Sequence, residues 1–331
     1  MRTKEHDIPY CGVRKKVIDK AEPELDMFAL KLFNEFIKER YNIHLKKDVL
    51  HKKPPYTDNK ILREYRFTNI RREHDRETIW LLDNIVNNEF LTYRQKLLNC
   101  ILFRLFNKHE TMEIIGGPIK FEGVFNPIPA RNKLYTYYKN HPKYVFFTGA
   151  FITGGLKRVL NMKYPNETFV PGCVIRFMKH LNESGIMDKI QAATTQEEVF
   201  NLLRDEEGIG EFLAYQIFVD FSYIKQFPFS ENEYTVAGPG CKKGLKYLFK
   251  DTDGMTPEEC LFWLRDNWCA VGELLEEDCW FDPKEEMIDL KHYDRVMNVM
   301  SLENCFCEFS KYYRAYTDTG RPRKKYKPRQ R

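Results

Sequence analysis

The sequence lacks the segments that would place a protein in a membrane or direct it to secretion. None of its apolar runs reaches the roughly 18 residues that a membrane-spanning helix requires. The first twenty residues carry several charged side chains and no apolar stretch of the kind found in signal peptides. We therefore expect no membrane association and an intracellular location, which would be the host cytoplasm for a phage or bacterial protein and the nucleus for a eukaryotic one.

Compact metal-binding motifs are also missing. The nine cysteines are scattered, and the gaps between Cys260, Cys269 and Cys279 match no CxxC-type ligand spacing. The eight histidines form no HExxH motif. An odd number of scattered cysteines in an intracellular chain favours reduced, buried thiols over disulfides. We predict no metal site and no other cofactor.

Positive charge is sparse outside the C-terminal end. The chain has 53 Lys and Arg residues against 48 Asp and Glu residues, a net charge of +5. Seven of the basic residues lie in Arg321–Arg331, which contains no acidic residue. The first 320 residues are therefore slightly acidic as a whole. A nucleic-acid-binding surface on this part of the chain must be a local patch.

The 331 residues, 43% of them hydrophobic, can form one large core or two lobes. Only two segments favour strands, Met112–Gly123 and Tyr144–Ile152. We predict a mainly α fold with two helical lobes and a few short strands. An N-terminal helical extension is expected at residues 1–58, a two-lobed helical domain at 59–320 and a flexible basic tail at 321–331. Apolar spacing of three and four residues predicts helices at Leu25–Tyr41, Thr68–Asn88, Arg94–Phe106, Gly172–Asn182, Gln196–Arg204, Glu211–Ile224, Thr256–Asn267 and Glu303–Tyr316.

Two glycines precede one of these helices, in the stretch EEGIGEFLAYQIFVDF at residues 206–221. Backbone amides at a glycine turn before a helix can approach a phosphate closely. The pattern GIGxxxA, which ends at Ala214, resembles the helix-hairpin-helix motif of the DNA glycosylase superfamily. We therefore predict that Gly208, Gly210 and Glu211 bind DNA. The alternative is a glycine that only terminates the preceding helix.

The residues that follow depart from that superfamily. Phe212 stands where its lyase members carry a catalytic lysine, and Gly238 stands near the position of the catalytic aspartate, which Glu231 or Glu233 could replace. Base excision needs such a carboxylate, so the sequence fits DNA binding better than glycosidic cleavage. In the segment TVAGPGCKKGL, residues 235–245, the predicted DNA-binding residues are Gly238, Gly240, Lys242 and Lys243.

Arginines and a carboxylate gather in REYRFTNIRREHDRETIWLL, residues 63–82. If this segment is helical, Arg71, Arg72 and Asp75 share the apolar stripe of Ile79, Leu82 and Val86. One interpretation is a buried Arg–Asp ion pair. The other is a pocket for an anionic group. In that case the catalytic candidates are Asn69, Arg71 and Asp75, and the phosphate-binding candidates are Arg63, Arg66, Arg72 and Arg76.

Several motifs together carry a more specific resemblance. RFTNIRREHDR at 66–76, LFRLFN at 102–107, the TVAGPG segment, and CEFSKYYR and GRPRKKY near the end resemble the helical family named after the 5-hydroxymethyluracil DNA kinases of bacteriophages. The resemblance runs from about residue 60 to residue 326. That family includes the α-glutamyl/putrescinyl thymine pyrophosphorylases, which are regarded as amino acid:DNA transferases.

The resemblance implies a helix-hairpin-helix DNA glycosylase-like fold and a role in thymine hypermodification. In the implied reaction, a hydroxymethyluracil in DNA is activated as a pyrophosphate ester, and an amine displaces the pyrophosphate at the 5-methylene carbon. The implied partners are double-stranded DNA with modified bases and an amine or amino acid, and the base must be flipped out of the duplex. The chain contains no GxxxxGK[ST] motif, so we do not expect ATP-dependent phosphorylation.

Two other functions fit the same residues. One is a DNA glycosylase that excises a bulky modified base, in repair or in defence against phage DNA. The other is an inert reader of modified DNA. The three functions differ in product, because the first leaves an altered nucleoside, the second an abasic site and the third unchanged DNA.

Overall fold

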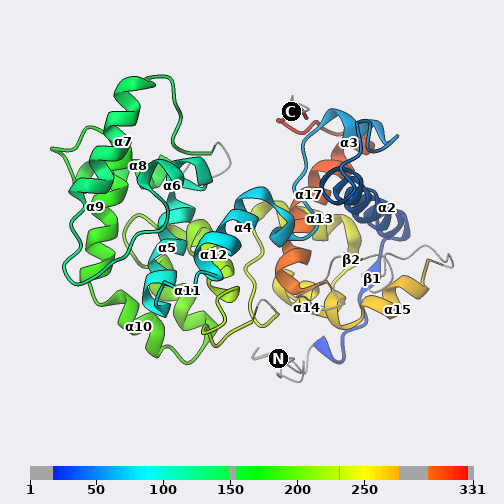
Figure 1. The fold of residues 1–331 in the computed structure, drawn as a ribbon. Helices are drawn as coiled ribbons and strands as arrows, with labels where there is room; N and C mark the ends of the chain where they lie inside the picture. Colours follow the sequence, from blue (N-terminus) through cyan, green and yellow to red (C-terminus); the bar gives the residue numbers. More distant parts are fainter. Residues whose placement is uncertain (1–17, 149–153, 231, 276–296, 327–331) are drawn as a thin grey trace. The chain divides into compact units, whose positions relative to one another are not determined.

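The computed structural model describes residues 18–148, 154–230, 232–275 and 297–326. The chain forms two compact units (Figure 1). Unit 1 consists of Met1–Asp75 and Asn232–Arg331, and unit 2 consists of Arg76–Glu231. The predicted domain limits at residues 58 and 320 stay predictions. No helix in the described part of the chain is long and apolar enough to cross a bilayer.

Unit 1 is built around the long C-terminal helix α17. Its apolar side chains pack with those of α2 and α13 in one core, which includes Phe33, Phe36, Leu245, Phe306 and Phe309. The Phe33 and Phe306 rings are stacked with centroids 4.4 Å apart. The elements of this unit are β1 (Glu24–Leu25), α2 (Met27–His44), a π-helical turn (Leu45–Val49), α3 (Lys60–Glu64), a 3-10 turn (Arg72–His74), α13 (Pro239–Leu248), β2 (Phe249–Asp251), α14 (Pro257–Asp266), α15 (Trp268–Glu273) and α17 (Val299–Tyr316).

Local capping residues set where these helices begin. Asp26 accepts a hydrogen bond from the Ala29 amide at the start of α2 (2.8 Å), and Asn298 accepts one from the Ser301 amide at the start of α17 (2.7 Å). Thr256 and Glu259 form a reciprocal capping box at α14. Because each cap satisfies amides that have no partner within the helix, the ends are fixed by sequence before tertiary packing.

Helices α13 and α17 approach closely at two glycines. A Cβ atom on Gly240 would lie 2.5 Å from Cys307 Sγ, and one on Gly244 would lie 2.9 Å from the Phe306 carbonyl carbon. Real Cβ atoms do not come this close to their neighbours. The spacing of four residues puts both glycines on one face of α13, so this face packs backbone against backbone on α17.

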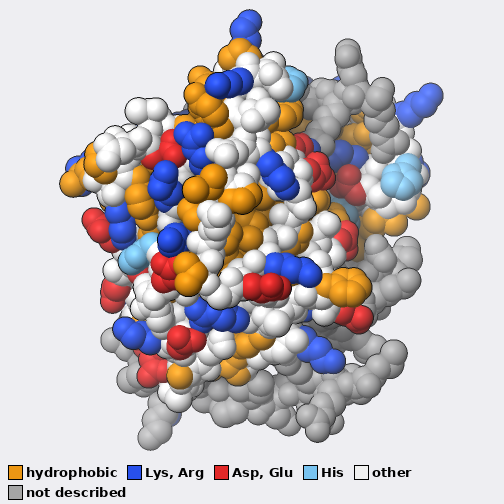
Figure 2. All heavy atoms as spheres, turned by 60° about the vertical axis from the view of Figure 1, so that its left-hand side comes forward, with side chains coloured by type: hydrophobic (Ala, Val, Ile, Leu, Met, Phe, Trp, Pro, Cys, Tyr) orange, Lys and Arg blue, Asp and Glu red, His pale blue; other side chains and the backbone are white. Residues whose placement is uncertain are grey.

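Unit 2 surrounds helix α5, which is buried on nearly every side. Two capping boxes, Thr92 with Gln95 and Thr195 with Glu198, start α5 and α11. On the face seen in Figure 2, basic and acidic side chains are interspersed. Its elements are α4 (Arg76–Leu81), a π-helical turn (Leu82–Val86), α5 (Tyr93–Phe106), α6 (His109–Ile115), α7 (Ile128–Asn140), α8 (Gly154–Lys163), α9 (Val170–Glu183), α10 (Ile186–Ala192), α11 (Gln196–Arg204) and α12 (Gly210–Ser222).

The mainly α fold class is confirmed, and most predicted helices correspond to observed ones within a few residues. The strand at Met112–Gly123 is wrong, because its first residues belong to α6 and Gly116 ends that helix with a φ of 106°. Residues 144–148 form no strand, and 149–152 lie outside the described residues. Among the described residues the sheet is the antiparallel pair β1 and β2.

The close contact of α13 with α17 gives a stability prediction. Gly244→Ala should lower the free energy of unfolding by about 3 kcal/mol, because the added methyl group must push the two helices apart. Gly320→Ala is the matched control, since its Cβ would lie 3.5 Å from the nearest atom, an ordinary contact. The control should change stability by less than about 0.5 kcal/mol. Urea unfolding of both variants tests this, and equal stabilities would contradict the packing argument.

Candidate functional site

The arginine-rich segment of unit 1 is not the helix that its periodicity predicts. Residues 68–75 are largely extended apart from the 3-10 turn, with ψ near 133° at Arg71 and 135° at Asp75. The predicted shared stripe is therefore wrong, and Ile79 is 45% exposed. The physical reason is local. Asn69 and Asp75 bond to backbone groups within the segment, and such bonds compete with helix formation.

Helices α2 and α17 hold this segment between them. Arg40 of α2 donates to the Thr68 carbonyl (2.9 Å) and to Asn69 Oδ1 (2.7 Å). From α17, Asn304 Nδ2 donates to the Asn69 carbonyl (2.9 Å), and Glu308 Oε2 accepts from the Thr68 amide (3.4 Å). Asn69 is itself buried. The segment is thus fixed by polar side chains from both neighbouring helices.

Asp75 and Arg71 do not pair with each other. Asp75 Oδ1 accepts hydrogen bonds from the Asn69 amide (3.2 Å) and from Asn69 Nδ2 (3.1 Å). Arg71, whose side chain is 1% exposed, pairs with Glu73 at 3.2 Å. Burial raises the pKa of Asp75, although the Asn69 bond and the charges of Arg72 and Arg40 oppose the rise. The structure therefore has an Arg71–Glu73 ion pair in place of the expected Arg–Asp pair. Asp75 instead links the end of the segment back to Asn69 through two hydrogen bonds.

A second carboxyl group that the sequence did not point to lies near this segment. Glu303 of α17 is 9% exposed, and its Oε1 accepts a hydrogen bond from the Gly238 amide at 3.2 Å. Burial raises the pKa of Glu303 to about 7, against the opposing effects of that bond and of Arg72. The apolar spacing of α17 did not single out Glu303 as a site residue, because this spacing shows which face of the helix is packed and not what a charged residue on that face contacts. Of the two glutamates proposed to replace the missing aspartate, Glu233 is half-buried and Glu231 lies outside the described residues.

The VAGPG turn that contains Gly238 leads directly into α13. Gly238 is the N-cap residue and is half-buried, while Lys242 and Lys243 are exposed on the first turns of the helix. Glycine is needed at position 240 because a larger residue would collide with Cys307. A DNA-binding role for these four residues stays a prediction.

The C-terminal basic segment is ordered against residues 64–66 of the same unit. Tyr65 and Lys325 form an antiparallel bridge, with bonds from the Arg66 amide to the Lys324 carbonyl (3.0 Å) and from the Tyr326 amide to the Glu64 carbonyl (2.8 Å). The expectation of a flexible tail is therefore wrong up to residue 326, and residues 327–331 lie outside the described part. The paired segments carry six exposed basic side chains, those of Arg63, Arg66, Arg321, Arg323, Lys324 and Lys325. Two of them have acidic partners, because Lys325 pairs with Glu64 (3.3 Å) and Arg321 with Asp318.

In unit 2, the glycine turn between α11 and α12 has the conformation that only glycine adopts easily. Gly208 has a φ of 105° and Gly210 a φ of 64°. Gly210 and Glu211 are exposed, and no described atom lies within 4 Å of a Cβ position on Gly210. The helices themselves pack on each other. Gly210 is thus open to solvent, whereas the amide of the buried Ile209 donates to the Glu206 carbonyl within the turn (3.0 Å). Binding of the turn to DNA stays a prediction.

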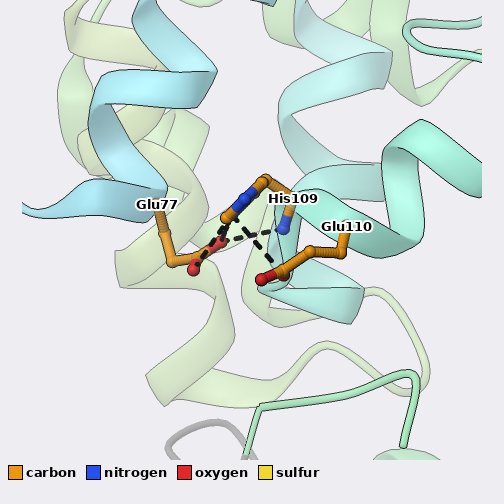
Figure 3. Close-up of side chains that lie close together, drawn as sticks. All are labelled: Glu77, His109 and Glu110. Carbon is orange, nitrogen blue, oxygen red and sulfur yellow. Dashed lines mark hydrogen bonds and ion pairs between the residues drawn. The ribbon is translucent and has the colours of Figure 1, made fainter. Parts of the chain in front are cut away.

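Arg76 lies in unit 2, where it contacts two members of a polar group. Figure 3 shows this group, formed by Glu77, His109 and Glu110. The Arg76 guanidinium contacts Glu77 at 2.5 Å and Glu110 at 3.2 Å. The ligand atoms of the other three residues lie within 4.8 Å of one another and could hold a divalent cation. However, Glu77 also accepts the His109 amide at the start of α6 (2.8 Å), and the Arg76 guanidinium pairs with both carboxylates. The contacts therefore describe an ion-pair network among these four residues.

Of the three cysteines whose spacing fits no metal motif, only Cys260 has a described side chain. Cys260 is a buried free thiol whose pKa is raised to about 12 by burial, so it stays protonated at neutral pH. Cys279 lies outside the described residues.

Two comparisons with known proteins give matches that cover most of the chain. A family model described as "5-hmdU DNA kinase, helical domain" matches residues 27–321. The 5-hmdU DNA kinase of Bacillus phage SP10 is 28% identical over 320 residues, which cover 91% of this chain and 48% of the phage protein. The chain thus spans about half the length of this curated relative. No solved structure matches.

The family match covers most of the chain, including the segment held between α2 and α17, the VAGPG turn and α17 itself. The resemblance drawn from the sequence motifs is confirmed by it. The chain therefore belongs to the family of the 5-hmdU DNA kinase helical domain.

Proposed function

We propose that this chain modifies a hydroxymethyluracil derivative in DNA by displacing a pyrophosphate from the 5-methylene carbon with an amine. Family membership supports action on this modified base in DNA. The observation that carries the proposal is the ordered basic surface of unit 1, formed by residues 63–66 and 321–325. It supplies the local positive patch that a slightly acidic body needs to bind a DNA backbone.

The polar segment at residues 68–75 follows this basic surface in the chain and supplies the chemistry. Arginine is suited to a leaving pyrophosphate because its planar fork binds phosphate oxygens in pairs. Arg72 is the candidate for this contact. We assign Asp75 a positioning role, because its Oδ1 accepts hydrogen bonds from both Asn69 donors and so joins the two ends of the segment. The base must leave the duplex before its methylene carbon can react.

The test is nucleoside mass spectrometry on DNA treated with the purified chain. The substrate is a duplex with one 5-(pyrophosphoryloxymethyl)uracil, incubated with glutamate, putrescine or other amines. An amine-substituted thymidine with release of pyrophosphate is the expected result. An abasic site would instead identify a glycosylase, and unchanged DNA with retained binding would identify a reader. Either of these outcomes overturns the proposal.

The basic surface of unit 1 gives a prediction for DNA affinity. Arg323→Gln with Lys324→Gln keeps the backbone bridge to Arg66 but removes two charges. The slope of log Kd against log salt should then fall by about 2 if both side chains contact phosphates. The control is Lys143→Gln with Lys189→Gln, two exposed lysines of unit 2. Fluorescence anisotropy over a range of salt concentrations measures both, and an equal change in the two variants would contradict the assignment.

Asp75→Asn separates positioning from proton transfer. The amide retains one acceptor oxygen for the Asn69 amide but loses the charge and part of the loop closure. We expect a loss of about 1–3 kcal/mol in the free energy of unfolding. Single turnover by the folded fraction should fall less than about tenfold. A fall of about 10² with unchanged stability, the scale of a lost general base, would make Asp75 the proton acceptor.

A further inference from the structure

We propose that the carboxyl group of Glu303 accepts the proton that the attacking amine releases, at the turn that begins helix α13. This inference rests on the proposed function and names a catalytic residue for it.

The geometry leaves one oxygen of this carboxyl available. Oε1 is held by the Gly238 amide at 3.2 Å. Oε2 makes no hydrogen bond to any residue in the described ranges. Glu303 is a buried residue, with 9% of its surface exposed. A proton acceptor needs both properties, a fixed position and a lone pair that a substrate can reach.

Glycine at position 238 makes room for this carboxyl. A Cβ there would lie 3.3 Å from Glu303 Oε1, closer than most such contacts. The next residue, Pro239, is exposed, so the turn borders the surface. Glu258 makes a comparable contact one residue earlier, where its Oε1 accepts the Ala237 amide at 2.9 Å. Two carboxyl groups thus bind adjacent amides at the start of α13, and burial raises the pKa of Glu303.

The surroundings tune the proton affinity of Glu303. Burial is the largest influence and raises the pKa to about 7. The Gly238 amide and Arg72 favour the ionised form, while Glu308 and Glu258 oppose it. The thiols of Cys241, Cys305 and Cys307 also face this charge, and all three have raised pKa values and stay neutral. A carboxyl group with a pKa near neutrality can both accept and return a proton at working pH.

The step balances in atoms and electrons. The amine nitrogen uses its lone pair to form a bond to the 5-methylene carbon. The bond from that carbon to the pyrophosphate oxygen breaks, and its electron pair leaves with the pyrophosphate. The nitrogen, now positively charged, gives one proton to Glu303 Oε2. The carboxyl then returns the proton to water.

The experiment measures single-turnover pyrophosphate release against pH, with the DNA substrate of the proposed function and excess amine. The parent rate should rise with pH through an inflection near 7. Glu303→Gln should lower the rate by about 10² or more and remove the inflection, and Glu303→Asp should restore part of both. The matched control, Glu258→Gln, should keep the parent's inflection and its rate within a few fold.

A second readout does not depend on activity. Because the pKa of Glu303 is raised from 4.5 to about 7 on folding, the protonated form stabilises the fold below 4.5, and this contribution is lost as pH rises through 7. Glutamine does not titrate, so the Glu303→Gln variant does not lose this stabilisation as the pH rises. The melting temperature of the variant minus that of the parent should therefore increase between pH 5 and pH 8.

The outcomes are distinct. If the parent releases no pyrophosphate with any amine, the proposed function fails and the proton-transfer step fails with it. If the parent is active and Glu303→Gln keeps its rate and its inflection, only the inference about Glu303 is overturned. A constant difference in melting temperature across the pH range would also overturn it, because Glu303 would then not titrate near neutrality.

Discussion

Charged side chains buried between helices must find partners, and this requirement shapes both units. In unit 2, Arg104 of α5 and Asp220 of α12 are both buried, and Nη2 of the arginine lies 2.6 Å from Oδ1 of the aspartate. The same guanidinium also donates to Asn107 at 2.7 Å. An unpaired charge in this position would cost about 3–5 kcal/mol. The pair therefore fixes the two helices that meet at the centre of the unit.

In unit 1, buried cations find their partners where the backbone of residues 68–75 is not α-helical. Arg71 is one of the largest fully buried side chains, and it pairs with Glu73 on the adjoining 3-10 turn. Arg40 donates Nε and Nη2 to the carbonyl of Thr68 and the side chain of Asn69, which a helix would not present to it, while its buried Nη1 has no partner among the described residues. The irregular backbone at residues 68–75 is thus the means by which cations are held inside a helical core. It also keeps arginines and a carboxyl group close together.

Sequence periodicity predicted regular helices well because it records which residues face the core. Gln196–Arg204 was predicted with the limits that α11 has, and α2 and α5 were placed within a few residues. It failed at residues 68–75, where side chains bond to the local backbone, since such bonds have no period. Two features of the candidate site depend on contacts between distant segments. Lys325 lies beside Tyr65, and Glu303 lies beside Gly238. Neither pairing leaves a signal in a single sequence.

The glycines show how one residue type serves two physical purposes in this chain. Gly208 and Gly210 adopt positive φ and form a turn. Gly240 and Gly244 have no such φ and instead allow α13 to contact the backbone of α17. This close contact has a chemical consequence, because Glu303 lies on α17 one turn before Cys307 and Phe306. If larger residues held the two helices apart, the carboxyl group would not reach the Gly238 amide. The packing that stabilises unit 1 is therefore also what places Glu303 at the turn.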